Sequence, residues 1–400
     1  MRSVPSERRG AAAATVTIAA CPVCGDGASE LLLELPAVPV NCSALHHSAA
    51  DASAAPTGAF RLVLCPACGY VRNDAFDAGA LTYDAAYENA LDFSPSFRAY
   101  LSDLAAELID RHDLHGRTIV EMGCGQGSFL GALCAGGENR GYGYDPSFRP
   151  GDLELPASVE IATELFVPAV VPVRGDLYCA RHVLEHIPDP LRFLDGLRPA
   201  VAERGAALYL EVPAGEAVFG GDATFDLVYP HVSYFSAPAL AGLLGRAGFA
   251  VDRIDRRFGG QYLSVEAHAG DGPAPPVAAE AVAAFVAEAR GAAAQLDRRL
   301  VAARRALDAA AAHGRQTALW GAGAKGVAFL ALLDRPVDAV VDINPRKRGS
   351  YLPGSGVVVD APEALAARRP EVVFVLNPMY REEISAMLAA QSISAEVVVV

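Results

Sequence analysis

The chain has 400 residues, 52% of them hydrophobic, and its 33 Lys and Arg against 47 Asp and Glu give a formal net charge of −14 at pH 7. This length allows two or three domains with well-filled cores, so the composition excludes a disordered or fibrous protein. The acidic balance argues against a general nucleic-acid or membrane-surface binder, because either would need a basic face. We therefore expect a small-molecule substrate, no nucleic-acid or membrane partner, and a monomer or a weak homodimer.

The first residues carry three arginines and an alanine run. The apolar stretch at residues 15–20 is too short for the apolar core of an export signal, and no apolar run in the sequence reaches the length that spans a bilayer. We expect residues 1–15 to form a disordered extension and the protein to be cytoplasmic.

Two near-identical Cys-x-x-Cys-Gly half-sites stand in residues 16–88. The first pairs Cys21 with Cys24 and the second pairs Cys65 with Cys68. Two thiolates separated by two residues can reach one tetrahedral ion, so the half-sites together predict a closed, structural four-thiolate zinc site. The stretch between them is longer than in an ordinary zinc ribbon, which implies an inserted strand pair or loop. A redox-active thiol pair is the competing interpretation.

The remaining cysteines are predicted to be small buried apolar residues. They are Cys42, Cys124, Cys134 and Cys179. Tyr83 and Tyr87 follow the cysteine module four residues apart, so a helical segment would place both rings on one face, usually as packing residues.

Residues 118–127 combine a β-branched run with a glycine turn ahead of a helix-like segment. Gly123, Gly125 and Gly127 are spaced G-x-G-x-G, and Glu121 precedes them. Glycines let the backbone approach a ligand, and the helix start offers free N–H groups. A carboxylate here would repel the pyrophosphate of a dinucleotide but suits the cationic tail of S-adenosylmethionine, so the turn favours that cofactor over NAD. A tight turn in another kind of α/β protein is the alternative.

Acidic and basic side chains follow the next predicted strands. Asp145 ends a short strand, where its carboxylate could accept both ribose hydroxyls of a nucleoside. Residues 177–190 predict a further strand with Arg181, His182 and His186 after it. Ligands of an open parallel sheet bind beyond the carboxyl ends of its strands, so these side chains are expected at the cofactor or the substrate. The predicted cofactor-binding residues are Glu121, Gly123, Cys124, Gly125, Gly127, Asp145, Arg181 and His182.

Residues 226–236 place His231 among three aromatic residues that include Tyr229, and Ser236 is predicted to cap the helix that follows. An imidazole held against aromatic faces can titrate near neutral pH, as a proton-abstracting base requires. A histidine packed in an aromatic cluster without a chemical role fits the segment equally well.

Residues 271–313 are alanine-rich with scattered charges and predict a helical connector. Beyond it, a strand leads into Gly321, Gly323 and Gly326, spaced G-x-G-x-x-G, and a second strand ends at Asp342. Considered alone, this pattern predicts an NAD site.

A third strand of the C-terminal part, residues 372–376, leads into Asn377 and Tyr380. The basic run at residues 346–348 is either a solvated charge cluster or a contact for a diphosphate. We thus expect a second nucleoside-type unit to face the first across a cleft.

Together these motifs resemble the zinc-containing sugar C-methyltransferases of bacterial deoxysugar and surface-polysaccharide pathways. The resemblance covers nearly the whole chain: the paired cysteine half-sites, the Glu-Met-Gly-Cys-Gly-Gln-Gly turn, Arg-His-Val-Leu-Glu-His ending at His186, and the segments of residues 229–236, 320–326 and 341–348. It implies an α/β fold with a class I methyltransferase Rossmann-like domain, residues 89–270. An N-terminal zinc-binding module, residues 16–88, and a second C-terminal Rossmann-like α/β domain, residues 314–400, would flank that domain.

The resemblance also implies the chemistry. The donor would be S-adenosylmethionine and the acceptor a nucleotide-linked keto sugar of natural-product or surface-glycan biosynthesis, methylated on carbon through an enolate. In this scheme His231 is the base, Tyr229 and His186 are nearby, and Tyr83 and Tyr87 line the pocket. The implied contacts to the nucleotide-sugar are Gly323, Lys325, Asn377 and Tyr380.

The chain departs from the family at Pro230, where relatives carry a glutamate. That carboxylate could orient the imidazole, which proline cannot do, and Asp222, Asp226 and Glu211 are the candidate replacements. The departure leaves O- or N-methylation of a sugar or another natural-product intermediate open. The C-terminal glycine turn leaves an NAD-dependent oxidoreductase open.

Overall fold

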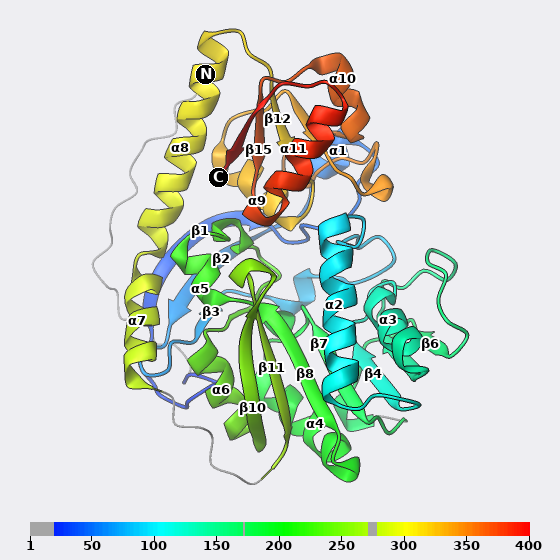
Figure 1. Ribbon diagram of the computed structural model, residues 1–400. Coiled ribbons are helices and arrows are strands. Elements are labelled where there is room, and N and C mark those ends of the chain that lie inside the picture. The colour runs from blue at the N-terminus through cyan, green and yellow to red at the C-terminus, as the bar shows by residue number, and fades with distance from the viewer. Residues whose placement is uncertain (1–19, 171–172, 271–277) are drawn as a thin grey trace.

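The computed structural model describes residues 20–170, 173–270 and 278–400 as three sheets with flanking helices (Figure 1). The predicted disordered extension, residues 1–15, lies outside the described residues. Within the three described stretches, no helix has both the length and the apolar character needed to cross a bilayer.

The N-terminal module is built on a sheet of order β1-β2-β3-β9. The stretch between the two cysteine half-sites holds the antiparallel pair β1 and β2. β9 comes from the middle of the chain and pairs with β3 through Val71 and Tyr234, which fixes the segment around His231 to the module. The elements are β1 (Glu30–Pro39), α1 (Ala49–Ser53), β2 (Thr57–Leu64), β3 (Val71–Asn73), the 3₁₀ turn η1 (Ala78–Ala80) and β9 (Ser233–Tyr234).

A larger sheet of order β10-β11-β8-β7-β4-β5-β6 forms the centre of the chain. β6, β5, β4, β7 and β8 run parallel, and β11 is antiparallel to β8 and β10. The residues that follow β4, β5, β7 and β8 therefore meet at one edge of the sheet, where ligands bind in open α/β folds. The strands are β4 (Thr118–Met122), β5 (Arg140–Tyr144), β6 (Val159–Ala162), β7 (Leu177–Arg181), β8 (Ala207–Pro213), β10 (Phe249–Arg257) and β11 (Tyr262–Ala269).

Different helices cover the two faces of this sheet. Ile119 packs with α2 and α3, whereas its neighbour Val120 packs in the core that contains α4 and α6. Successive strand residues alternate sides, which is why apolar runs bury both faces. Ser236 caps α6 through Ala239 N–H, as the sequence predicts. The elements are α2 (Pro95–Arg111), α3 (Ser128–Gly137), η2 (Pro168–Val170), η3 (Leu184–His186), α4 (Pro190–Arg204), α5 (Gly215–Gly220), η4 (Thr224–Asp226), α6 (Ala237–Arg246) and η5 (Phe258–Gly260).

Two helices, α7 and α8, lead along one side of the molecule into a C-terminal parallel sheet of order β14-β13-β12-β15-β16 (Figure 1). This sheet has the strand arrangement of a Rossmann-like unit. The elements are α7 (Ala279–Arg290), α8 (Ala292–Ala312), β12 (Thr317–Trp320), α9 (Ala324–Leu333), β13 (Ala339–Val341), η6 (Pro345–Lys347), β14 (Val359–Asp360), η7 (Pro362–Ala364), α10 (Leu365–Arg368), β15 (Val372–Val375), η8 (Pro378–Tyr380), α11 (Arg381–Ala390) and β16 (Glu396–Val399).

The C-terminal unit is held against the rest of the molecule by apolar and polar contacts. The rings of Phe225 and Phe329 lie 5.1 Å apart in a core that residues of all three sheets share. Gln261 and Asn377 donate to each other through their amide groups at 2.6 and 2.9 Å, both buried. A fixed docking of this kind gives the space between the units a defined shape.

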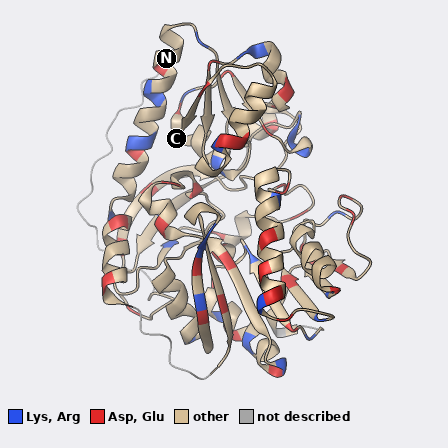
Figure 2. Ribbon diagram, in the orientation of Figure 1, with Lys and Arg blue, Asp and Glu red and all other residues tan. Residues whose placement is uncertain are grey.

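Charges on the central unit are arranged as pairs. Figure 2 shows acidic and basic residues interspersed along β10 and α2. Arg257 of β10 pairs with Glu107 of α2 at 2.7 Å, and Arg111 pairs with Glu107 and with Glu266 of β11. These contacts fasten α2 across the antiparallel strands.

Candidate active site

Two neighbouring cavities lie beyond the carboxyl ends of the central strands. The first, about 250 Å³, is lined by the glycine turn after β4 and by Asp145 after β5. The second, about 300 Å³, is lined by His231 and by the glycine turn after β12. The residues that line both are Tyr87, Asn89, Ala90, Leu91, His182 and His186. The cavities therefore adjoin, as a donor site and an acceptor site must.

The turn after β4 has the backbone geometry of a ligand-binding loop. Gly123 has φ 66°, and a Cβ there would lie 2.3 Å from Val183 Cγ2, so only glycine fits. Gly125 N–H donates to Asp145 Oδ2 at 2.8 Å, which joins the ends of β4 and β5. Gly127 precedes α3 with no side-chain cap, which leaves the first N–H groups of that helix available to a ligand. Gly123, Cys124, Gly125, Asp145 and Glu121 all line the first cavity.

Glu121 is a buried acid in this cavity with an unsatisfied oxygen. The residue is 2% exposed, and Oε2 has no hydrogen-bond partner among the residues that the structure describes. Burial raises the pKa of Glu121 to about 8, although the charge of Arg181 opposes the rise. A buried carboxylate oxygen without a partner marks the place of a missing polar or cationic group. The ammonium group of S-adenosylmethionine fits this place.

Arg181, at the end of β7, is held by aromatic rings and a carboxylate. Its guanidinium lies 4.8 Å from the centre of the Phe129 ring and pairs with Glu211 at 2.7 Å. Because Glu211 also accepts from Tyr100 and Tyr209, its carboxylate is fully engaged.

His182 stands at the junction of the two cavities. Its backbone has φ 55°, an unusual conformation for a residue with a side chain. The ring nitrogens lie 3.7 Å from Glu185 and 3.2 Å from Glu211. Burial lowers the pKa of His182, but the two carboxylates outweigh burial, so that the net shift is upward. The ring also contacts Tyr262 edge to face at 4.5 Å.

His186 and His231 present two neutral imidazoles to the second cavity. His186 Nδ1–H donates to the carbonyl of Pro230 at 2.9 Å, and His231 Nδ1–H donates to the carbonyl of Asp226 at 3.1 Å. A backbone carbonyl can only accept, so each pairing leaves Nε2 with a free lone pair. Burial lowers the pKa of both rings to about 4, which keeps them neutral at neutral pH.

The backbone carbonyl of Asp226 orients the imidazole of His231. A carboxylate at position 230 was expected to have this role, but the chain has Pro230 there. Among the three candidate replacements, Asp222 is exposed and Glu211 is engaged with Arg181. Asp226 orients His231 through its backbone and pairs its carboxylate with Lys325 at 2.9 Å. The imidazole therefore has a fixed tautomer without the family glutamate.

Tyr83 and Tyr87 reach the site from the N-terminal module. The segment is not helical, because Asp84 accepts from Ala86 N–H and forms a turn in place of a helix. The two rings still meet, with centroids 5.0 Å apart, and the Tyr83 ring lies 5.9 Å from that of His186. The Tyr83 hydroxyl is buried and has no hydrogen-bond partner in the described part of the chain, and Tyr83 lines the first cavity.

Tyr229 is placed differently from the expected catalytic position. Its ring packs 5.4 Å from Phe76, and a Cβ at Gly58 would lie 2.4 Å from it. Its hydroxyl accepts from Asp77 N–H at 2.9 Å, and it lines neither of the two cavities. The expected catalytic role therefore does not fit this placement, which is that of a core residue.

The C-terminal glycine turn forms the far wall of the second cavity. Gly326 packs so closely on Gly321 that a Cβ would lie 2.2 Å from the Gly321 carbonyl oxygen. Asp342 accepts from Ala322 N–H at 2.7 Å and from Lys347 Nζ at 3.3 Å. Gly323, Lys325, Asn377 and Tyr380 line this cavity, as do Asp342 and Lys347. Asn377, however, has its side-chain amide paired with Gln261.

The basic run at residues 346–348 is divided between two environments. Arg346 pairs with Asp152, and Arg348 lies 3.8 Å from Glu363 at the surface. Lys347 alone is buried and faces the second cavity.

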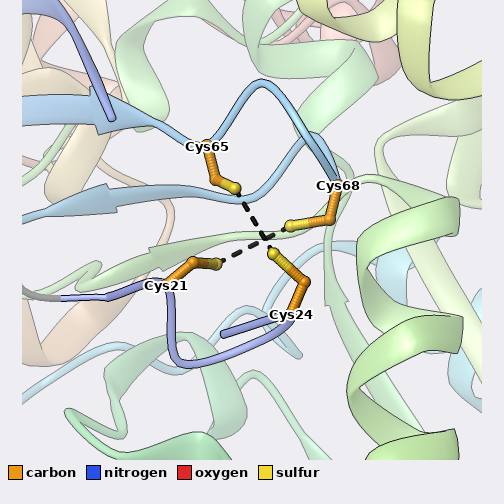
Figure 3. Close-up of side chains that lie close together, drawn as sticks. All are labelled: Cys21, Cys24, Cys65 and Cys68. Atoms are coloured by element: carbon orange, nitrogen blue, oxygen red, sulfur yellow. Dashed lines mark hydrogen bonds between the residues drawn. The ribbon is translucent and has the colours of Figure 1, made fainter. Parts of the chain in front are cut away.

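The four cysteines of the half-sites converge on one point (Figure 3). The Sγ atoms of Cys21 and Cys68 lie 3.7 Å apart, and those of Cys24 and Cys65 lie 3.5 Å apart. A tetrahedral zinc ion with Zn–S bonds of about 2.3 Å holds its sulfurs about 3.8 Å apart, so the donor set fits zinc. Cys42, Cys124, Cys134 and Cys179 are buried, as the sequence predicts.

Two family matches divide the chain. Residues 96–254 match the family described as Methyltransferase domain, and residues 281–399 match the family described as C-methyltransferase C-terminal domain. The first match contains the glycine turn, Asp145 and His182. The chain is an S-adenosylmethionine-dependent methyltransferase. Together with the order of the central strands, this match confirms the predicted class I methyltransferase fold.

The methyltransferase is also similar to a curated relative over most of its length. It is 28% identical over 307 residues to the C-methyltransferase NovU of Streptomyces niveus. The aligned region covers 71% of this chain and 71% of the relative. This relative and the match of the C-terminal domain both indicate a C-methyltransferase.

Solved structures similar to the methyltransferase have low overall agreement with it. One is an S-adenosylmethionine-dependent methyltransferase from Aquifex aeolicus, with 22% identity, coverage of 44% of this chain and 94% of that chain, and a TM-score of 0.35. Another is the pyocyanin biosynthetic protein PhzM, with 23% identity, coverage of 42% of this chain and a TM-score of 0.34. The methyltransferase spans 55% of the PhzM chain.

Glu185 is a residue of the methyltransferase site that motif reasoning missed. It is 1% exposed, lines the second cavity, and has no hydrogen-bond partner on either carboxylate oxygen among the described residues. One ligand-type atom from each of Glu185, His186 and His231 lies within 4.8 Å of the other two. The signal in the sequence was its position directly before His186, beyond the end of β7.

Proposed function

We propose that the methyltransferase transfers a methyl group to carbon in a nucleotide-linked keto sugar, in natural-product or surface-glycan biosynthesis. The observation that carries the proposal is the pair of neutral imidazoles in the second cavity, one of which, His186, also lines the first. Carbon acids need a base, whereas a methyl donor alone suffices for intrinsically nucleophilic acceptors. The similarity to a C-methyltransferase and the matched C-methyltransferase domain support the same choice.

The reaction would use His231 as the base. Nε2 of His231 accepts the proton from the carbon next to the keto group, and the electrons of that C–H bond form the enolate. The enolate carbon then bonds to the methyl carbon of the sulfonium, while the methyl–sulfur bond breaks and S-adenosylhomocysteine leaves. The proton remains on His231 as an imidazolium, which the carbonyl of Asp226 continues to hold in place. His186 and His182 lie beside the path between the cavities.

The cofactor would occupy the first cavity. Glu121 would meet the ammonium group, Asp145 the ribose hydroxyls, and the N–H groups at the start of α3 the remaining polar atoms. Bound there, S-adenosylmethionine supplies the electrophilic methyl group. Tyr83 and Tyr87 would close the cavity from the N-terminal module.

The acceptor's nucleotide would lie against the C-terminal turn. Gly323 and Lys325 would contact its diphosphate, because the start of α9 has no side-chain cap and lines the second cavity. Tyr380 lines the same cavity and offers a ring and a hydroxyl to the nucleoside. The four cysteines would hold a structural zinc ion, since all four positions are filled by protein ligands.

The proposal is tested by incubating the enzyme with S-adenosylmethionine and a panel of nucleotide-linked 4-keto sugars. A product heavier by one methylene, with loss of deuterium from a labelled carbon next to the keto group, is expected. Retention of deuterium in a methylated product would overturn C-methylation at that carbon.

A second candidate is O- or N-methylation, which Pro230 in place of the glutamate of relatives leaves open. His231→Gln identifies N-methylation, since an amine acceptor should keep most of its rate without the base, whereas a methylated product that retains deuterium next to the keto group identifies O-methylation. Stabilisation by NADH with no response to S-adenosylhomocysteine in thermal melts would instead favour an oxidoreductase.

A further inference from the structure

Asp226 connects His231 to the C-terminal domain. Its backbone carbonyl accepts from the imidazole at 3.1 Å, and its carboxylate pairs with Lys325 Nζ at 2.9 Å. Asp226 ends η4 beside the histidines, whereas Lys325 stands in the first turn of α9, on the opposite wall. All three residues line the second cavity.

The charges of Asp226 and Lys325 both act on the protonation of the His231 ring. Among the described residues, the ionisable groups that face the imidazole are Asp226, Lys325, His182, His186, Glu185 and Tyr234. Asp226 favours the protonated ring, and Lys325 disfavours it. The Asp226 side chain is 11% exposed and that of Lys325 is 22% exposed, so water screens neither charge fully. As long as the two are paired, the charge of Lys325 opposes that of Asp226 at His231.

An anion at the glycine turn would compete for Lys325. Gly321, Gly323 and Ala324 line the second cavity at the uncapped start of α9. In the proposed function, on which this inference rests, the diphosphate of the acceptor occupies this place. Its negative charge would neutralise Lys325 and leave the Asp226 carboxylate free to act on the imidazole.

We infer that Asp226 and Lys325 are positioning residues through which an anion at the C-terminal glycine turn activates His231. The base then becomes effective when an acceptor with a diphosphate is bound. The imidazolium formed by proton transfer is stabilised by Asp226 at the moment it appears. Selectivity for nucleotide-linked over free sugars thus arises at the proton-transfer step as well as in binding.

The titration of His231 measures this coupling without an acceptor. The nine histidines are labelled with ¹³C at Cε1, and the His231 resonance is identified by its absence in His231→Gln. The protein is titrated alone, with inorganic pyrophosphate, and with uridine diphosphate. We expect either anion to raise the midpoint of His231 by about one pH unit or more, as removal of a nearby positive charge does.

Variants separate the coupling from a structural role. Lys325→Met should raise the midpoint of His231 without any anion and abolish the response, whereas Lys325→Arg should restore wild-type behaviour. Asp226→Asn keeps the orienting carbonyl but should lower the midpoint and remove the response. Lys347→Met is the matched control, because Lys347 lines the same cavity but pairs with Asp342, and it should leave the midpoint of the free protein unchanged.

The inference is overturned if Lys325→Met titrates like the wild type, or if neither anion moves the His231 midpoint. The Lys325→Met comparison needs no acceptor, so it is independent of the methyl-transfer assay. A failed coupling with successful C-methylation leaves the proposed function standing, and a shifted midpoint without C-methylation leaves the coupling standing.

Discussion

The ring of His186 lies edge to face against that of His231, with centroids 5.0 Å apart, and each imidazole donates its Nδ1–H to a backbone carbonyl. Backbone carbonyls are fixed by the chain and do not titrate. The two free Nε2 atoms therefore remain acceptors over a wide pH range, on rings that both line the second cavity.

Replacement of the base is the first test of this arrangement. His231→Gln should reduce C-methylation by roughly 10²–10⁴-fold, the usual contribution of a general base. The affinity for S-adenosylhomocysteine should stay unchanged, because His231 lines only the second cavity. Rates from mass spectrometry and affinities from calorimetry check both expectations.

Tyr229→Phe is the matched control for this experiment. Its hydroxyl accepts from Asp77 N–H in the core, so the variant should lose about 1 kcal/mol of unfolding free energy and keep its rate. A Tyr229→Phe variant with normal stability and no activity would instead show that the Tyr229 hydroxyl has a catalytic role.

The rate should depend on pH through the neutral imidazole. Burial lowers the pKa of His231 to about 4, and the base acts in its unprotonated form. At saturating S-adenosylmethionine, the value of kcat/KM for the acceptor should therefore be constant at neutral pH and fall only as the pH drops through about 4. Because kcat reports the complex, anion coupling would place its acidic limb at higher pH than that of kcat/KM. Coincident limbs in the wild type would contradict the coupling.

The lowered pKa values of His186 and His231 also make the free energy of unfolding depend on pH. An unfolded histidine titrates near pH 6.5, whereas His186 and His231 in the folded protein titrate at about 4. Between these values the unfolded chain binds more protons. The contribution of these two histidines to the free energy of unfolding should thus be at its full value above about pH 6.5 and decrease toward pH 4. His231→Gln should show a shallower decrease in denaturant titrations.

Local patterns in the sequence were sufficient for the parts of the site that adjoin in the chain. Glu121 and the glycines lie within one turn, and Asp145 follows on the next strand, so spacing alone brought them together. Tyr229 was misplaced because its surroundings, Gly58 and Asp77, come from the distant N-terminal module. Tyr229 is close to His231 in the sequence, but this closeness does not determine the direction in which the Tyr229 ring points.

Contacts between domains were beyond sequence reasoning for a related reason. The pairing of Asp226 with Lys325 and that of Gln261 with Asn377 join segments whose approach depends on how the C-terminal sheet docks. The sequence singled out Asp226, Lys325 and Asn377 one by one, but it did not indicate which residues they pair with. The docking itself is determined by apolar contacts such as that of Phe225 with Phe329, which no motif describes.

The zinc proposal predicts one equivalent of zinc per chain by elemental analysis. Cys65→Ser removes a buried ligand and should lose the metal and several kcal/mol of stability, since a structural ion contributes directly to folding. Cys179→Ser, in a buried strand away from the cluster, is the control and should retain the metal. Full zinc content in Cys65→Ser would rule out the four-thiolate site.

Glu121 makes the affinity for the cofactor depend on pH. Because burial raises its pKa to about 8, the free carboxyl is mostly protonated at pH 7 and must release a proton to meet the ammonium group of S-adenosylmethionine. The affinity should therefore rise with pH between about 6 and 8. Glu121→Gln should bind about 10- to 100-fold more weakly, the contribution of a hydrogen bond to a charged group, and should lack this rise.

Calorimetry in two buffers that differ in ionisation enthalpy detects the released proton directly. The wild type should show buffer-dependent binding heats below pH 8, and Glu121→Gln should not. Glu160→Gln, an exposed substitution on β6, two strands away from β4, is the control and should behave as the wild type. Binding of S-adenosylmethionine without proton release in the wild type would show that the ammonium group does not meet Glu121. The unsatisfied oxygen of this buried acid would then need a different partner, such as an ordered water.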